Sequence, residues 1–176
     1  ILMLGACLPE ETERAIKDNV MPTLSSLEEA RRFSKAAGKL NKTVRAHIKV
    51  DTGMGRLGVP APDAIQLIQA ATKLPRLEIN GLYTHYASAE DNASFSGRQR
   101  QAFSQLIQSL DQVPVYLHAN NSAALLHEPD SIYNLARPGL LVYGVLPPGR
   151  RRAPAILKKN LHAALSWKCR VSFLKT

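Results

Sequence analysis

Four polar side chains that could bind or transform a small molecule each follow a stretch with the composition of a β-strand. They are Arg56, His85, Ser122 and Arg137. The clearest of these stretches is the β-branched run 44–50, which leads into a glycine-rich loop that carries Arg56. In parallel α/β proteins the carboxyl ends of successive strands meet at one face, where ligand-binding groups gather. We therefore expect the four side chains to share one site, in which a guanidinium group suits a carboxylate.

The elements that must position these side chains alternate between strand and helix. The predicted strands span residues 1–5, 19–24, 44–50, 77–83 and 113–117, with a stub at 135–136; the predicted helices start at Pro9 and at Ser25, which forms a capping box with Glu28, and span 60–73, 97–110 and 123–127. Such alternation implies parallel strands in βαβ units. The chain supplies about six units, whereas a closed (β/α)8 barrel has eight and about 250 residues. The predicted fold class is α/β, an incomplete (β/α)8 TIM-type barrel followed by the start of a β-domain.

The domain organisation follows from changes in composition along the chain. Residues 1–146 are predicted to form the partial barrel. Residues 147–164 are predicted to be a linker, because their first part is rich in proline, glycine and arginine. Residues 165–176 alternate between apolar and polar side chains, which predicts the first strand of a truncated C-terminal β-domain. We expect both the beginning of the barrel and the rest of the β-domain to lie outside this chain.

Composition is ordinary for a soluble globular protein, with 45% hydrophobic and 21% charged residues among 176. The net charge of +9 raises the possibility of nucleic-acid binding. Apart from Arg150–Arg152, however, the basic residues are dispersed, and no aromatic stacking motif accompanies them, so a nucleic-acid partner is not predicted. Cys7 and Cys169 have no metal-type spacing and are expected to be free thiols in a reducing cytosol; no metal site and no membrane span are predicted.

Four motifs occur in a fixed order along the chain. Residues 47–58 are HIKVDTGMGRLG, 81–89 are GLYTHYASA, 118–124 are HANNSAA, and 136–144 are ARPGLLVYG. Together they resemble the alanine racemases, pyridoxal-phosphate (PLP) enzymes of the barrel-fold class, and the resemblance covers nearly the whole chain. It implies a bacterial, cytoplasmic, homodimeric enzyme that interconverts L- and D-alanine and so supplies D-alanine for peptidoglycan.

The resemblance also implies which residues hold the cofactor. Arg137 matches the arginine that hydrogen-bonds the pyridine nitrogen of PLP. Because a guanidinium keeps its proton, that nitrogen stays unprotonated, and the weaker electron sink favours racemisation over transamination. Ser122, Gly139 and Leu140 match the phosphate-binding positions, and Asn121 is a weaker match to a residue on the hydroxyl side of the cofactor.

The remaining matches concern the substrate and the bases. Arg56 matches the arginine that contacts the substrate carboxylate and the catalytic tyrosine, and His85 matches the histidine that hydrogen-bonds that tyrosine. Lys49 matches a lysine that is carbamylated in some members. In the family, the two bases are the lysine that binds PLP and a tyrosine from the partner subunit; the first is expected before residue 1 and the second after residue 176. We therefore expect the chain by itself to be inactive.

Three other functions remain open on the sequence. The first is racemisation of serine or of several amino acids, because part of the substrate pocket is expected outside this chain. The second is a non-catalytic PLP-binding module, against which the strand-like start at Leu165 argues. The third is a nucleic-acid binder, which would bind DNA or RNA with a steep dependence on salt.

Overall fold

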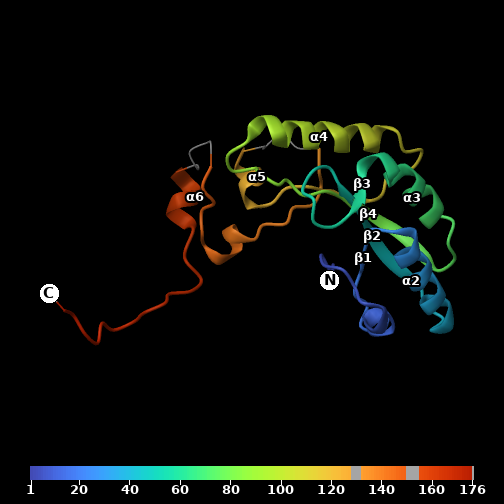
Figure 1. The fold of residues 1–176 in the computed structure, drawn as a ribbon, viewed down its shortest axis with the longest axis horizontal. Helices are drawn as coiled ribbons and strands as arrows, with labels where there is room; N and C mark the ends of the chain where they lie inside the picture. The colour runs from blue at the N-terminus through green and yellow to red at the C-terminus, as the bar shows by residue number, and fades with distance from the viewer. Residues whose placement is uncertain (128–131, 150–154, 176) are drawn as a thin grey trace.

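A curved parallel sheet with helices packed along it forms the body of the molecule (Figure 1). The computed structural model describes residues 1–127, 132–149 and 155–175. The strands are β1 (Thr23–Leu24), β2 (Val44–Asp51), β3 (Val59–Pro60), β4 (Leu77–Tyr83) and β5 (Tyr116–His118). The helices are α1 (Thr12–Lys17), α2 (Leu27–Lys39), α3 (Ala64–Ala71), α4 (Ala93–Gln108), α5 (Ser122–His127) and α6 (Ala155–Asn160), with 3-10 turns η1 (Pro9–Glu11), η2 (Ala61–Asp63) and η3 (Leu140–Tyr143).

The sheet runs in the order β1-β2-β4-β5, and every pair in it is parallel. Strand β3 pairs with the end of β2. Single parallel bridges, Leu2 with Met21 and His118 with Leu135, continue the order beyond β1 and β5. Six neighbouring chain segments thus follow one another in sequence order with helices between them, as in a (β/α) barrel that has not closed. The predicted α/β class and incomplete barrel are confirmed.

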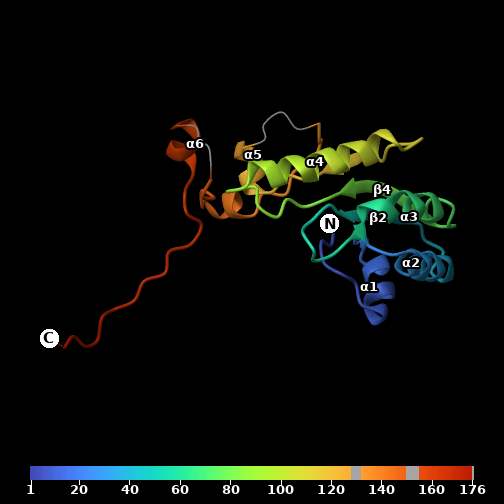
Figure 2. The same cartoon turned by 45° about the horizontal axis from the view of Figure 1, so that its top comes forward.

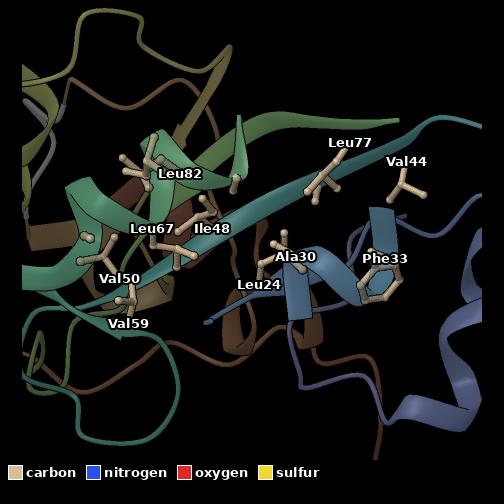
Figure 3. Packing of buried hydrophobic residues seen from close by; sticks show 14 of the residues in the cluster. Leu24, Ala30, Phe33, Val44, Ile48, Val50, Val59, Leu67, Leu77 and Leu82 are labelled. Carbon is tan, nitrogen blue, oxygen red and sulfur yellow. The ribbon is translucent and has the colours of Figure 1, made fainter. Parts of the chain in front are cut away.

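Strand β2 is buried on both faces, which explains how the core and the site share one element. On one face Ala46, Ile48 and Val50 are fully buried against the helices. Figure 3 shows Ile48 and Val50 among the packed apolar side chains of β1, β4, α2 and α3. On the other face His47 and Lys49 are also buried, at 1% and 3% exposure. A strand buried on both sides is typical of parallel sheets, and here the inner side is polar.

The helices bury the faces that their periodicity predicts. Ala64, Leu67, Ile68 and Ala71 of α3 are all buried, as expected. Helix α2, however, is capped by Ser26 and not by Ser25, because the Ser26 hydroxyl accepts from the Glu29 backbone N–H at 3.1 Å. Helix α4 begins four residues before the predicted Gly97, because the Asn92 side chain accepts from the Phe95 N–H at 2.9 Å and caps the helix there.

The ends of the predicted strands differ more. The segment 1–5 contributes a single bridge at Leu2, and Ile1 is 92% exposed, so the prediction of a buried strand there was wrong. The fifth strand begins at Tyr116 and not at Val113, and Val113 and Val115 are exposed. In both places apolar composition suggested burial, but burial depends on a neighbouring segment that covers the side chain.

The C-terminal part departs from the rest of the fold. Of the predicted linker, residues 150–154 lie outside the described residues, and 155–160 form helix α6. Residues 161–175 have no regular secondary structure and extend away from the sheet in two views (Figures 1 and 2), with Trp167 89% exposed. The strand predicted at 165–173 is not formed here, since a strand requires a neighbour for its backbone hydrogen bonds. Within the described ranges no helix is long and apolar enough to cross a membrane.

Gly81 of β4 permits the close approach of the His47 ring. The two residues pair across β4 and β2, next to a register shift between Ala46 and His47. A Cβ on Gly81 would overlap the buried imidazole.

We therefore expect Gly81→Ala to lower the free energy of unfolding by about 1–3 kcal/mol, as overpacked core substitutions do. Gly97→Ala in α4 is the matched control, because its Cβ meets nothing within 4 Å and alanine should stabilise a helix interior by about 0.5–1 kcal/mol. Urea denaturation measures both changes. Equal stability of the two variants would contradict the steric argument.

Candidate active site

Arg137 joins the carboxyl ends of two strands. Its Nη2 donates to the carbonyl oxygens of Thr84 at 2.6 Å and Ala119 at 3.1 Å, and lies 3.3 Å from Nδ1 of His85. Its backbone N–H donates to the Asn120 carbonyl at 2.9 Å. Thr84 follows β4 and Ala119 follows β5, so one guanidinium fixes both strand ends. Two of the predicted site residues, Arg137 and His85, are thereby brought into contact.

A chain of two imidazoles continues inward from Arg137. Nη1 of Arg137 contacts Nδ1 of His118, and Nε2 of His118 lies 2.8 Å from Nδ1 of His47. Because a guanidinium can only donate, Nδ1 of His118 must accept, and the proton of His118 must be on Nε2. That proton is then donated to Nδ1 of His47, whose own proton is on Nε2. The geometry therefore sets both rings in the neutral Nε2–H form.

The pKa values agree with this assignment. Burial, reinforced by the charge of Arg137, lowers the pKa of His118 to about 2 and that of His47 to about 4. The same causes, with smaller contributions from Arg56 and Lys49, lower the pKa of His85 to about 4. Burial lowers the pKa of Arg137 to about 10, so this group keeps its charge at neutral pH. The guanidinium of Arg137 is therefore a buried cation in contact with neutral imidazoles.

The ring of Tyr83 packs against both His118 and Arg137. Its ring stacks on His118 at 4.5 Å between centroids and lies 4.8 Å below the guanidinium carbon of Arg137. The Lys49 ammonium lies 5.7 Å from the same ring, so Lys49 faces inward as predicted. Burial raises the pKa of Tyr83, and its hydroxyl is 2.8 Å from the Thr23 hydroxyl. Cations above an aromatic face are stabilised by the ring's quadrupole, which offsets part of their desolvation.

The loop that carries Arg56 is held in shape by hydrogen bonds to Asp51. The Asp51 carboxylate accepts from the N–H groups of Gly53 at 2.9 Å and Gly55 at 3.0 Å, which curls the loop after β2. Gly58 closes the loop at φ +118°, where a Cβ would be 2.9 Å from the Asp51 nitrogen. The Arg56 side chain is exposed, yet its charge helps lower the pKa of Lys49 and His85. The charge of Arg56 is therefore close to the site.

The predicted phosphate-binding residues Ser122, Gly139 and Leu140 lie at the starts of α5 and η3. The Ser122 hydroxyl accepts from the Leu141 N–H at 3.2 Å, which joins the start of α5 to the second residue of η3. Asn121 instead caps α5, because its side-chain oxygen accepts from the Ala124 N–H at 2.9 Å. In this structure Asn121 thus serves the helix.

Three residues that build this site, His47, His118 and Gln99, are not among those predicted from the sequence. His47 and His118 both lie inside the motifs. For His47 the sequence signal was its position two residues before Lys49, on the same side of the predicted strand. Gln99 of α4 is 1% exposed and shares a helical face with Phe103 and Leu106, four and seven residues later. A polar side chain on an apolar face was the signal for Gln99. Among the described residues no group of three or more His, Cys, Asp or Glu side chains is arranged to hold a metal.

The three site histidines predict a dependence of stability on pH. The unfolded histidines have a pKa near 6.5, whereas the folded values are about 4 for His47 and His85 and about 2 for His118. Below pH 6.5 the unfolded chain therefore binds protons that the folded chain does not. The free energy of unfolding should be greatest above pH 6.5 and fall between pH 6.5 and 4, by up to about 1.4 kcal/mol per pH unit for each histidine.

Urea denaturation across that range, with ring ¹⁵N NMR of the folded chain, measures the effect. His118→Phe keeps a ring on Tyr83 and should remove one histidine's share of the slope. Imidazolium signals from His118 at pH 6 in the folded chain would contradict the assignment.

Residues 1–147 match the family described as alanine racemase, N-terminal domain. The alanine racemase of Carboxydothermus hydrogenoformans is 39% identical, covering 99% of this chain and 48% of that relative. That of Halothermothrix orenii is 35% identical, covering 99% of this chain and 46% of the relative. This chain spans about half the length of these curated relatives.

Solved structures give the same result. An alanine racemase of Clostridium difficile 630 superposes with a TM-score of 0.80 at 31% identity, over 84% of this chain and 40% of that one. The alanine racemase from Bartonella henselae, solved with covalently bound pyridoxal phosphate, superposes with a TM-score of 0.74 at 29% identity, over 85% of this chain and 43% of that one. By its sequence and its parallel sheet, the chain belongs to the alanine racemase family of PLP-dependent isomerases, within the N-terminal domain.

Proposed function

We propose that this chain is the cofactor-binding part of an enzyme that interconverts L- and D-alanine with PLP. The observation that carries the proposal is the buried guanidinium of Arg137, fixed to the ends of two parallel strands. Strand ends are where barrel enzymes place their chemistry. A donor that cannot lose its proton there suits an acceptor nitrogen of a bound ring.

The charges of the site fit an anionic cofactor and substrate. Lys49, Arg56 and Arg137 are close enough for the two arginines to lower the pKa of Lys49. The ion pairs formed within the described ranges join Arg14 to Asp18, Lys17 to Glu13, and Arg45 to Glu78, so none involves these three cations. Lys49 and Arg137 are buried, and a phosphate or carboxylate would supply the opposite charge that buried cations favour.

In this proposal each residue has a separate role. When bound, PLP withdraws electrons from the substrate and so eases removal of its α-proton. Arg137 holds the pyridine nitrogen, while Ser122, Gly139 and Leu140 bind the phosphate. Asn121 supports this part of the site by capping α5.

The substrate side of the site belongs to Arg56, His85 and Lys49. Arg56 binds the substrate carboxylate, and His85 orients the tyrosine base. Lys49, whose pKa is lowered mainly by burial, is the group that carbon dioxide would carbamylate; the resulting anion would pair with Arg56.

Other features of the proposal are an internal barrel segment at 1–146, a linker at 147–164 and a β-domain from 165. We also propose that the complete protein is a homodimer in the bacterial cytoplasm.

Serine or a broader set of amino acids is the second candidate substrate. Comparing the turnover of alanine with that of serine by the complete enzyme separates the two.

Substitution of Arg137 tests the proposal. In the complete protein with PLP, Arg137→Lys should lower kcat for alanine racemisation by about 100-fold or more, because a single ammonium cannot reproduce the forked contacts. Arg31→Lys, on the exposed face of α2, is the matched control and should leave kcat unchanged. Circular dichroism of the alanine solution measures the rate. Full activity of the Arg137 variant would refute the proposed role.

The 176-residue chain itself should not racemise alanine above the rate of free PLP, because the resemblance assigns both bases to positions outside it. The measurement is the loss of optical rotation of L-alanine with PLP added in excess. Turnover above that background by the chain alone would contradict this prediction and would require a base among its own residues.

A further inference from the structure

Gln99 of α4 uses its whole side-chain amide to connect two loops of the site. Its Nε2 donates to the Thr52 hydroxyl at 3.2 Å and to the His85 carbonyl at 3.0 Å. Its Oε1 accepts from the Ala87 N–H at 3.0 Å. The carbonyl can only accept and the N–H can only donate, so the orientation of the amide is fixed. Gln99 is 1% exposed, and both of its donors are satisfied.

The two loops that Gln99 connects carry Arg56 and His85. Thr52 begins the loop after β2, and its hydroxyl lies 2.7 Å from that of Thr84 at the end of β4. The Thr52 oxygen accepts from Gln99, and either hydroxyl of the Thr52–Thr84 pair can be the donor to the other. The loops are thus joined by one side-chain amide and two hydroxyls, and we name Gln99, Thr52 and Thr84 the loop clamp.

The loop clamp and Arg137 hold the same backbone from opposite sides. Arg137 binds the Thr84 carbonyl and Nδ1 of His85 from within the sheet. Gln99 binds the His85 carbonyl from helix α4 outside it. The helix itself is attached to the same loop, because the Ser96 hydroxyl donates to the Ser88 carbonyl at 3.2 Å. His85 therefore cannot shift without breaking a buried hydrogen bond, which is costly.

We propose that Gln99 is a positioning residue that sets His85 relative to the loop of Arg56; this inference rests on the proposed racemase function. Catalytic groups lose much of their effect when displaced by about 1 Å. An apolar residue on this face of α4 would pack as well as its neighbours but would leave two backbone groups unpaired.

The test uses the complete protein loaded with PLP. Gln99→Met keeps the volume and removes all three hydrogen bonds; we expect kcat for alanine to fall by about 10- to 100-fold and KM to rise. Gln105→Met, on the exposed face of the same helix, should match the parent in both constants. Thr52→Val removes only the hydroxyl and should lower kcat in the same direction, which provides a second variant if Gln99→Met does not fold.

Gln99→Glu adds a readout that a purely structural role would not give. An ionised glutamate accepts from Ala87 but opposes the His85 carbonyl, whereas a protonated one can donate to it. Burial raises the pKa of such a carboxyl. We expect the ratio of the variant's kcat to that of the parent to rise as pH falls from 8 to 6.

The outcomes separate the inference from the function on which it rests. If the parent protein does not racemise alanine, the proposed function fails. If the parent is active and the Gln99 and Thr52 variants melt at lower temperature with unchanged kcat and KM, the positioning role is overturned and Gln99 is structural. A pH-independent kcat ratio for Gln99→Glu would likewise overturn it.

Discussion

The burial of one charge, that of Arg137, governs the arrangement of this site. Taking a guanidinium out of water is unfavourable by several kcal/mol unless its donors are satisfied. Here two carbonyl oxygens and two imidazoles satisfy them, and all belong to the ends of parallel strands or the residues that follow. The same contacts require neutral histidines, so the charge that anchors the strand ends also sets the protonation of His118 and His47.

Strand β2 contributes side chains both to the site and to the apolar core. Its outer side chains belong to the apolar core, and its inner side chains, His47 and Lys49, belong to the site. A shift of one residue in its pairing would exchange the two sets and destroy both. The close fit of His47 against Gly81 and the register shift beside it keep the pairing in place. Stability and site geometry therefore depend on the same backbone register.

The site is supported from two sides with different chemistry. On the inner side the support is cationic and aromatic, with Arg137 and Lys49 above Tyr83. On the outer side it is neutral, with Gln99 joined to backbone groups and to Thr52. The neutral support fixes loop positions without adding charge, so the field that the inner cations present to an anion is not weakened. This division suits a family in which one domain holds a phosphorylated cofactor.

The sequence by itself determined the strand–helix order, the α/β class, the family and the placement of Arg56, His85, Ser122 and Arg137 at strand ends. Local patterns suffice there, because periodicity and motif order are properties of neighbouring residues. Only the tertiary structure decided that His118 meets His47, 71 positions earlier, that Gln99 reaches two loops, and that the segment after α6 forms no strand. Those outcomes depend on which surfaces meet across the sheet, and a side chain's partner there is set by register and burial, which no local pattern encodes.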